Sequence, residues 1–351
     1  MKEKIVQTKK HKNMKKVILL IILLSYLWTF GQTPANDPHW QLVWEDNFNA
    51  LNTNIWLVQD NFDHYGEKQV FINENVYTEN GSLVCEIKNE SYSCPSWAIE
   101  PNWHCVRQYN TGQPYSYTSG WIESKAAYNS QYGYIEARIN FPYQYALWPA
   151  FWTFIGDGVT NGTNAAEIDI AEMLGETGPN IITTNIHKVF PDNNIYREDI
   201  SPLNYSWGYG NWHKYAIEWS PSKIIWYVDD SPIRVFPNHG IIDPVKIILG
   251  IGLRPDNQLN TTCFPQKMYV DYVRVYNLKN DCKITLSLCN YNFGTHDNKV
   301  KQNILIGNGS CTNALNIGEN VYLRASEGVL INGDFTVPVG AEIYIDVNSC
   351  Y

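Results

Sequence analysis

The sequence predicts an all-β protein, a two-sheet β-sandwich of the jelly-roll kind followed by a small β module. Several stretches alternate apolar and polar residues with a period of two, and turn signals such as "ENGS" and "DDSP" separate them. No long stretch carries a convincing helical stripe. Many strands in one domain of about 240 residues favour two packed sheets.

The strands can be read individually. "YGYIEARINF" alternates strictly, with Ile135, Ala137 and Ile139 on one face. Residues 213–220 and 223–236 predict a pair of strands and then a hairpin with an Asp-Asp-Ser-Pro turn. "KMYVDYVRVYNL" alternates again before the chain changes character.

Composition limits the classes of function. Hydrophobic residues make up 44% of the 351 residues and charged ones 17%, which allows a sizeable core. The net charge of -9 disfavours nucleic acid as a partner, because a phosphate backbone would be repelled. The 13 Trp and 24 Tyr can fill a β-rich core, and they can also line a cleft with flat faces suited to sugar rings.

The first 32 residues resemble a secretory signal peptide. Lysines precede "VILLIILLSYLWTFGQ", an apolar run of roughly a dozen residues that is short for a membrane span. Translation can start at Met1 or Met14, and we expect cleavage near Gly31 or Gln32. A membrane anchor is the alternative. We expect a bacterial protein that is secreted or held at the cell surface, without stable membrane insertion after cleavage.

Export allows disulfides among the eight cysteines. We expect Cys94 and Cys105 to close a loop, since "CPSWAIEPNWHC" resembles a long surface insertion. No CxxC pair with zinc spacing is present, so structural zinc is not expected. The other pairings cannot be read from the sequence.

A boundary is expected near residues 277–281, because the aromatics thin out and Trp disappears after Tyr276. Residues 281–351 are read as the small C-terminal β module, similar to modules at the ends of secreted Bacteroidetes proteins. A spacer, a sorting element and a carbohydrate-binding module all remain open as its role.

The stretch "AAEIDIAEMLGE" sets three acids, Glu167, Asp169 and Glu172, among small and apolar residues. In a strand Glu167 and Asp169 share one face, but Glu172 is an odd number of residues from Glu167. One β-bulge between Asp169 and Glu172 would return all three acids to the same face. A helix is the alternative, and it would scatter them towards solvent. Three carboxylates on one strand make a poor calcium cage.

Carboxylates on one face suit glycoside hydrolysis, which needs one ionised and one protonated carboxyl group at the scissile bond. Crowding of like charges separates their pKa values and so divides the two roles. A third acid between them can share a proton with one of them.

These residues resemble glycoside hydrolase family 16, whose members carry Glu-x-Asp-x-x-Glu on a strand of a concanavalin A-like jelly roll. "QLVWEDNFNA", "ENGSLVCEI", "YTSGWIESK", "LWPAFWTFIG" and "MYVDYVRVY" also agree with the family in order. The match covers residues 38–277. The resemblance implies a retaining endo-β-glycosidase that acts as a monomer on a polysaccharide.

The resemblance also implies roles for single residues. Glu167 matches the nucleophile, Glu172 the general acid/base and Asp169 the assisting acid. The residues that the resemblance places at the substrate are Trp148, Trp152, His187, Glu67, Gln69 and Trp121, the last standing where the family usually has Arg.

Departures from the family pattern bear on the substrate and on metal binding. "LRPDNQLNTTCFP" replaces a Gly-Gly-Asn-Trp-like segment. A β-1,3- or β-1,3/1,4-glucan is favoured, while agar, porphyran or carrageenan, or a non-catalytic glycan-binding jelly roll, are the alternatives. No cofactor is required. Asp271 matches one ligand of a structural calcium found in some members, although Asn47 stands where an acid is usual.

Overall fold

The computed structural model describes residue 34 and residues 40–64, 67–101, 104–155, 165–188, 194–200, 209–220, 223–254, 263–278, 284–294, 297–307 and 309–347. The expected signal peptide, residues 1–32, lies outside this set. The chain divides into two compact units. One is Pro38–Lys279, and the other contains the strands that follow Asn280.

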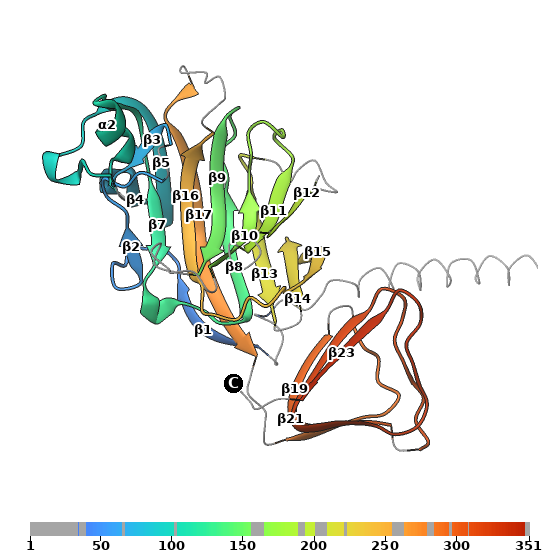
Figure 1. Ribbon diagram of the computed structural model, residues 1–351. Helices are drawn as coiled ribbons and strands as arrows, with labels where there is room; N and C mark the ends of the chain where they lie inside the picture. Colours follow the sequence, from blue (N-terminus) through green and yellow to red (C-terminus); the bar gives the residue numbers. More distant parts are fainter. Residues whose placement is uncertain are drawn as a thin grey trace, which may run out of the picture. The chain divides into compact units, whose positions relative to one another are not determined.

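Two sheets build the larger unit (Figure 1). Within the described residues the first sheet has ten strands, in the order β15-β14-β13-β8-β17-β5-β6-β3, with β1 added beside β17 and β4 beside β5. Its strands are β1 (Trp40–Asp46), β3 (Gln69–Phe71), β4 (Val76–Glu79), β5 (Ser82–Tyr92), β6 (Tyr115–Ser119), β8 (Gly133–Asn140), β13 (Trp212–Trp219), β14 (Lys223–Val228), β15 (Ser231–Pro237) and β17 (Gln266–Leu278).

The second sheet has seven strands in the part of the chain that the structure describes, in the order β12-β11-β10-β9-β16-β7-β2. They are β2 (Trp56–Val58), β7 (Trp121–Ser124), β9 (Leu147–Phe154), β10 (Ala166–Glu172), β11 (Ile182–Lys188), β12 (Asn194–Ile200) and β16 (Lys246–Leu253). The all-β sandwich that the sequence predicts is therefore confirmed.

The core lies between the two sheets and follows the period-two alternation. Ile135, Ala137 and Ile139 of β8 are fully buried there, as their spacing predicts. Ile168 and Leu249 from β10 and β16 of the second sheet belong to the same core. Because alternate residues point inward, the other residues of β9, β10 and β16 are left for the opposite face of the seven-stranded sheet.

The hairpin predicted at Asp-Asp-Ser-Pro joins β14 to β15. Asp229 and Asp230 adopt positive φ angles of 48° and 66°, which a tight two-residue hairpin turn requires and which Asp tolerates. The helical alternative for the acid-rich stretch is excluded, since Ala166–Glu172 forms β10. The helical elements within the described ranges are short: α2 (Val106–Thr111), η1 (Asn73–Asn75), η2 (Ser96–Ala98) and η3 (Ala126–Tyr128).

Disulfides link residues in both units. Cys94 and Cys105 are bonded, as expected from the loop between them. Cys289 is bonded to Cys311 in the C-terminal unit. Cys85 is a buried free thiol and Cys263 an exposed one. Cys282 and Cys350 lie outside the described residues.

The C-terminal unit differs from the sandwich in how its strands pair. All of its strand pairings among the described residues are parallel, in a four-stranded sheet and a two-stranded sheet. Leu288, Ile304 and Leu323 belong to its own small core. Its strands are β18 (Thr285–Leu288), β19 (Asp297–Ile306), β20 (Asn313–Ala314), β21 (Asn320–Ile331), β22 (Phe335–Thr336) and β23 (Glu342–Val347).

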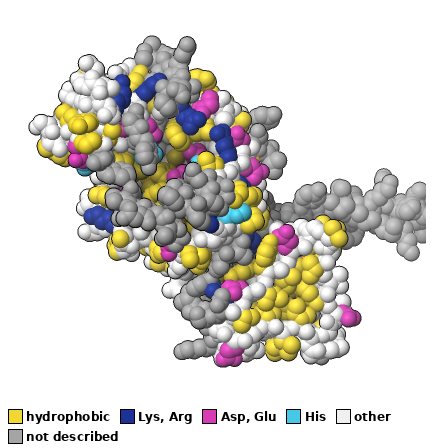
Figure 2. All heavy atoms as spheres, viewed as in Figure 1, with side chains coloured by type: hydrophobic (Ala, Val, Ile, Leu, Met, Phe, Trp, Pro, Cys, Tyr) yellow, Lys and Arg dark blue, Asp and Glu magenta, His cyan; other side chains and the backbone are white. Residues whose placement is uncertain are grey.

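The surface of this unit carries exposed apolar side chains, among them Ile317, Leu330 and Val339. Figure 2 shows hydrophobic side chains gathered on the face of the unit that is turned to the viewer. Among the residues that the structure describes, no helix is long and apolar enough to cross a membrane.

Candidate active site

A β-bulge in β10 places the three acids. Glu167 lies opposite Phe154 of β9 and Glu172 lies opposite Ala150. Five steps along β10 therefore match four steps along β9, and Ile170 is the extra residue. The pairing of β10 with β11 shifts its register between the same two acids. The predicted bulge is confirmed, and it returns Glu172 to the face of Glu167 and Asp169.

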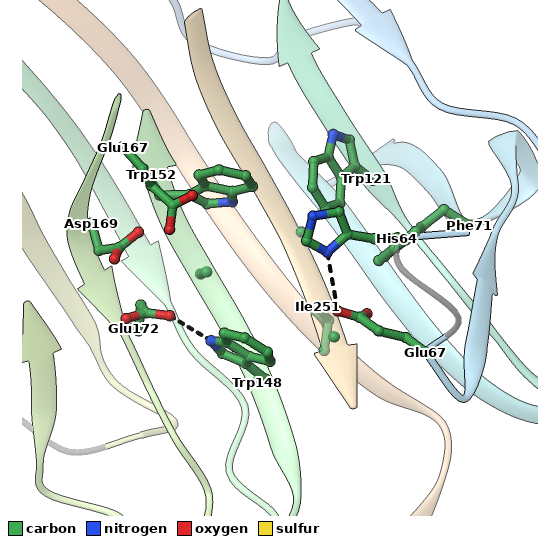
Figure 3. A pocket seen from close by; sticks show the side chains of 13 residues that line it. His64, Glu67, Phe71, Trp121, Trp148, Trp152, Glu167, Asp169, Glu172 and Ile251 are labelled. Carbon is green, nitrogen blue, oxygen red and sulfur yellow. Dashed lines mark hydrogen bonds and ion pairs between the residues drawn. The ribbon is translucent and has the colours of Figure 1, made fainter. Parts of the chain in front are cut away.

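Glu172 is held by two donors from the neighbouring strands. The indole Nε1 of Trp148 on β9 donates to Glu172 Oε1 at 2.5 Å (Figure 3). The Asn185 side-chain amide on β11 donates to Glu172 Oε2. Trp148 is itself fixed, because the Arg254 guanidinium lies 4.7 Å from its ring centroid and pairs with Glu176 at 2.9 Å. The orientation of the Glu172 carboxyl group is therefore set by both neighbouring strands.

Glu167 and Asp169 share a histidine neighbour. His187 on β11 lies directly opposite Glu167, and its Nε2 is 3.7 Å from Glu167 Oε1 and 3.3 Å from Asp169 Oδ2. Asp169 is almost fully buried, whereas the side chain of Glu167 keeps 26% of its surface exposed. Glu167 thus reaches the cleft and Asp169 lies behind it. Among the described residues, Glu167, Asp169 and His187 are the one group of three acidic, His or Cys side chains close enough together to hold a metal ion.

Crowding changes how the acids hold protons. Burial, then the charge of Asp169, raises the pKa of Glu172 to about 8, against the lowering effect of the hydrogen bonds from Trp148 and Asn185. Burial, the charges of Asp169 and Glu172, and a hydrogen bond with Asp169 raise the pKa of Glu167 well above its ordinary value. Glu167 and Glu172 therefore both favour the protonated form more than an isolated glutamate does.

The opposite side of the cleft is mostly aromatic (Figure 3). The Trp121 ring meets Phe71 and Trp152 edge-on, with ring centroids 5.0 Å and 5.4 Å apart. His64 lies against Trp121, and its Nδ1 is 3.1 Å from Glu67 Oε1. The described residues that line the cleft are His64, Glu67, Phe71, Trp121, Trp148, Ala150, Trp152, Glu167, Asp169, Glu172, Gly250, Ile251 and Gly252.

Gln69 differs from the sequence-based expectation. Its side chain is fully buried and does not belong to the cleft lining. The amide Nε2 donates to Glu67 Oε2, and Oε1 accepts the main-chain N–H of Leu253 at 3.2 Å. Through these two hydrogen bonds Gln69 supports Glu67 from behind, and its buried side chain has no surface with which to touch a sugar.

Asp271, the expected calcium ligand, lies on β17 of the other sheet. Its Oδ2 is paired with the Arg138 guanidinium at 2.7 Å. Within the described ranges Asp271 belongs to no cluster of three acidic, His or Cys ligands. A carboxylate already neutralised by arginine is a poor start for a calcium site, which needs six or more oxygens. Asp271 is therefore engaged by Arg138, and no step below depends on a calcium ion.

Sequence reasoning missed three contributors to the site. Asn185 stands two residues before His187, so the period of two could have placed both on one strand face. His64 belongs to a loop, where no periodicity operates. Trp226 on β14 donates from its indole to the main-chain oxygen of Asp169 at 2.8 Å. No sequence signal marks that contact, because its acceptor is a backbone atom 57 residues away.

Comparison with known proteins identifies the family. A family model described as glycosyl hydrolases family 16 matches residues 63–262, more than half of the chain. The chain belongs to glycosyl hydrolases family 16. The matched segment contains the bulged strand and its three acids. The protein is a glycoside hydrolase, and hydrolysis with retention of configuration is general in this family.

Individual relatives agree with this assignment. A beta-glucanase from Rhodothermus marinus is 25% identical over 294 residues, which covers 75% of this family 16 chain and 94% of the relative. A kappa-carrageenase from Pseudoalteromonas carrageenovora is 28% identical, covering 66% and 62%. The crystal structure of the laminarinase catalytic domain from Thermotoga maritima shares 27% identity with a TM-score of 0.57, covering 69% of this chain and 99% of that one. The chain spans only 36% and 37% of two other curated relatives.

Proposed function

We propose that this family 16 enzyme hydrolyses internal β-linkages of an uncharged β-glucan, of the β-1,3 or mixed β-1,3/1,4 type, with Glu167 as nucleophile and Glu172 as general acid/base. The observation that carries the assignment of roles is the bulge, which points both carboxyl groups into one cleft. The difference in exposure supports this division of roles, because the Glu167 side chain is 26% exposed whereas Glu172, which also lines the cleft, is almost fully buried and hydrogen-bonded.

The first step forms a glycosyl-enzyme. A Glu167 oxygen attacks the anomeric carbon while the bond to the leaving oxygen breaks, and Glu172 gives that oxygen its proton. In the second step the Glu172 carboxylate takes a proton from water, and the water oxygen attacks the same carbon and releases Glu167. Two inversions at one carbon give net retention. A pKa of about 8 keeps Glu172 protonated for the first step at neutral pH.

Asp169 supplies the third role. A nucleophile must be ionised when it attacks, yet crowding favours a proton in the Glu167–Asp169 pair. When the shared proton lies on Asp169, Glu167 carries the charge and Asp169 donates a hydrogen bond to it. Glu167 loses its negative charge when it forms the bond to the sugar and regains it when that bond breaks. The hydrogen bond from Asp169 holds the Glu167 carboxyl group in place through both changes.

The charge of the cleft favours a neutral substrate. Glu67 and the three acids of β10 are the charged residues that line it within the described ranges, and neither Lys nor Arg is among the described lining residues. A sulfated galactan would bring anionic groups against these acids, which costs binding energy. The aromatic faces of Trp148 and Trp152 offer the apolar contact that the C–H faces of glucose rings need. The carrageenase relative keeps a galactan as the second candidate.

Reducing-sugar release from laminarin, lichenan, agarose, porphyran and carrageenan tests the proposed substrate class. We expect laminarin or lichenan to be cut into oligosaccharides, with little release from the sulfated polymers. Release from carrageenan or porphyran alone would contradict the neutral-substrate argument. Binding without release from any of the five would favour a glycan-binding role.

Asp169→Asn should lower kcat about 10²-fold or more with little change in KM, since the variant keeps shape and hydrogen bonding but cannot exchange a proton with Glu167. The pH–rate profile should shift as well, because a titrating carboxyl group next to Glu167 and Glu172 is removed. The control is Asp271→Asn on the other sheet, which we expect to stay near wild-type activity. Nearly full activity and an unchanged profile in Asp169→Asn would refute the shared proton.

Trp148→Phe should move the alkaline limb of the pH–rate profile to higher pH. The indole hydrogen bond lowers the pKa of Glu172, so its loss raises that pKa. The first step needs protonated Glu172, and the rate falls as pH rises through its pKa. Trp152→Phe is the matched control on the same strand face, without a bond to Glu172. If the alkaline limb of the pH–rate profile lay at the same pH in Trp148→Phe and Trp152→Phe, the role given to Trp148 would be contradicted.

We also propose that the protein is exported and loses residues 1–32. The basic and apolar N-terminal segment supports this proposal. Disulfides in both units support it too, because disulfides persist mainly outside the cytoplasm. Sequencing the N-terminus of protein recovered from the culture medium or cell surface should show a start close to residue 33, whereas an intact N-terminus would contradict cleavage.

A further inference from the structure

The bulge is contacted from the core side by a side chain of the other sheet. Trp226 on β14 is fully buried between the sheets, and its indole Nε1 lies 2.8 Å from the main-chain oxygen of Asp169. Asp169 immediately precedes Ile170, the extra residue of the bulge. A bulge interrupts the regular ladder of strand hydrogen bonds. The indole N–H therefore donates to the backbone directly beside the bulge of β10.

A second side chain of the same sheet holds the strand opposite. Arg234 on β15 is the cross-strand partner of Trp226, and its guanidinium lies 4.7 Å from the Trp226 ring centroid. Its Nη1 donates to both the main-chain oxygen and the hydroxyl of Thr184, each at 2.9 Å. Thr184 stands between Asn185 and Thr183, the partners of Asp169 and Glu172 on β11.

The Arg234 guanidinium makes further contacts with β12. Its Nη2 donates to the main-chain oxygen of Tyr196 on β12 at 3.1 Å, and its Nε lies 2.9 Å from Glu198. The stacked pair of Trp226 and Arg234 thus reaches main-chain oxygens on β10, β11 and β12. These contacts cross the core from the ten-stranded sheet to the sheet that carries the acids.

We propose that Trp226 and Arg234 are positioning residues, which fix the bulge and its opposite strand and thereby set Glu172 relative to Glu167 and Asp169. Neither residue is among the described residues that line the cleft. The inference rests on the function proposed above, because it concerns the same acids. Without the indole donor, β10 can relax towards a regular strand, which would turn Glu172 away from the face of Glu167.

Trp226→Phe removes the donor while keeping an aromatic ring in the core. Trp219→Phe is the matched control, since Trp219 is equally buried in the same core and its Nε1 has no hydrogen-bond partner among the described residues. Both variants lose similar packing, and Trp226→Phe also loses a buried hydrogen bond, so it should melt at a somewhat lower temperature than Trp219→Phe. Trp226→Phe should lower kcat about 10- to 100-fold relative to Trp219→Phe, with KM changed less than about threefold, as a small misplacement of reacting groups does.

A titration of the carboxyl groups by ¹³C NMR on protein with labelled Glu provides a readout that needs no turnover, with Glu172→Gln assigning the resonance. Wild type and Trp219→Phe should show Glu172 titrating near its raised pKa of about 8. In Trp226→Phe the pKa of Glu172 should differ from that of both wild type and Trp219→Phe, because its burial and its distance from Asp169 both change, and the alkaline limb of the rate profile should move with it. If Trp226→Phe does not fold, Arg234→Lys provides a second variant. It keeps the positive charge but loses the hydrogen bonds of the guanidinium to Thr184, and it should shift the titration of Glu172 as well.

If Glu172 had the same pKa in Trp226→Phe and in Trp219→Phe, the inference would be overturned. Equal kcat values in these two variants would also overturn it. An inactive wild-type enzyme would instead contradict the proposed function, while the titration still decides whether Trp226 positions Glu172.

Discussion

Replacing Glu167 with alanine is expected to lower kcat by roughly 10⁵- to 10⁶-fold, as removal of a covalent nucleophile does. The side chain of Glu167 reaches the cleft, and no other acid of β10 is as exposed. The variant cannot form the glycosyl-enzyme, and the alanine leaves space beside the anomeric carbon. Sodium azide should enter that space and restore part of the activity on a substrate with a good leaving group.

The product of this rescue is diagnostic. Azide attacks from the side that Glu167 occupied, so the glycosyl azide should have inverted configuration, which ¹H NMR of the anomeric proton shows. Glu79→Gln, which removes a carboxylate paired with Lys267 on the other sheet, controls for the loss of one negative charge and should stay active. Residual activity within about tenfold of wild type would exclude Glu167 as the nucleophile.

Glu172→Gln should lower kcat on polysaccharide by about 10²- to 10⁴-fold, the usual contribution of general acid–base assistance. The amide oxygen can still accept from the Trp148 indole, and the amide NH2 can donate to Asn185 once that side chain turns its oxygen towards it, but the amide cannot give a proton to the leaving oxygen. Wild-type activity should fall as pH rises through about 8, where Glu172 loses its proton. The variant should lack this alkaline limb, because the titrating group is gone.

The leaving group separates this role from a structural one. An aryl glycoside whose leaving group needs no proton should form the glycosyl-enzyme nearly as fast with Glu172→Gln as with wild type. Added azide should then capture that intermediate and give a glycosyl azide of retained configuration. A uniform loss on activated and unactivated substrates would contradict the acid/base role of Glu172.

The geometry of the three acids could be predicted from the sequence, because it follows from the number of residues between them and the period of two in a strand. Glu167 and Glu172 are an odd number of residues apart, so a strand that uses both on one face must contain a bulge. The period-two strands of the sandwich follow from the same alternation, as Ile135 and Ile139 show.

Other features depend on the packing of distant segments and leave no local signal. Trp226 contacts a main-chain oxygen of another sheet, and any residue at position 169 would provide that oxygen. Gln69 follows the family pattern, yet burial turns it into a support for Glu67. The parallel pairing in the C-terminal unit was not predicted, since alternation within a strand does not say in which direction its neighbour runs.

The most direct test of the account is to trap the glycosyl-enzyme and locate it. A 2-deoxy-2-fluoro glycosyl fluoride of a laminari-oligosaccharide should react with the wild-type enzyme and add its mass once. Peptide mapping by mass spectrometry should place the sugar on Glu167, and Asp169→Asn should label more slowly at the same position. A label on Glu172, or hydrolysis of laminarin with inversion and no covalent label, would contradict the arrangement of nucleophile and acid proposed for β10.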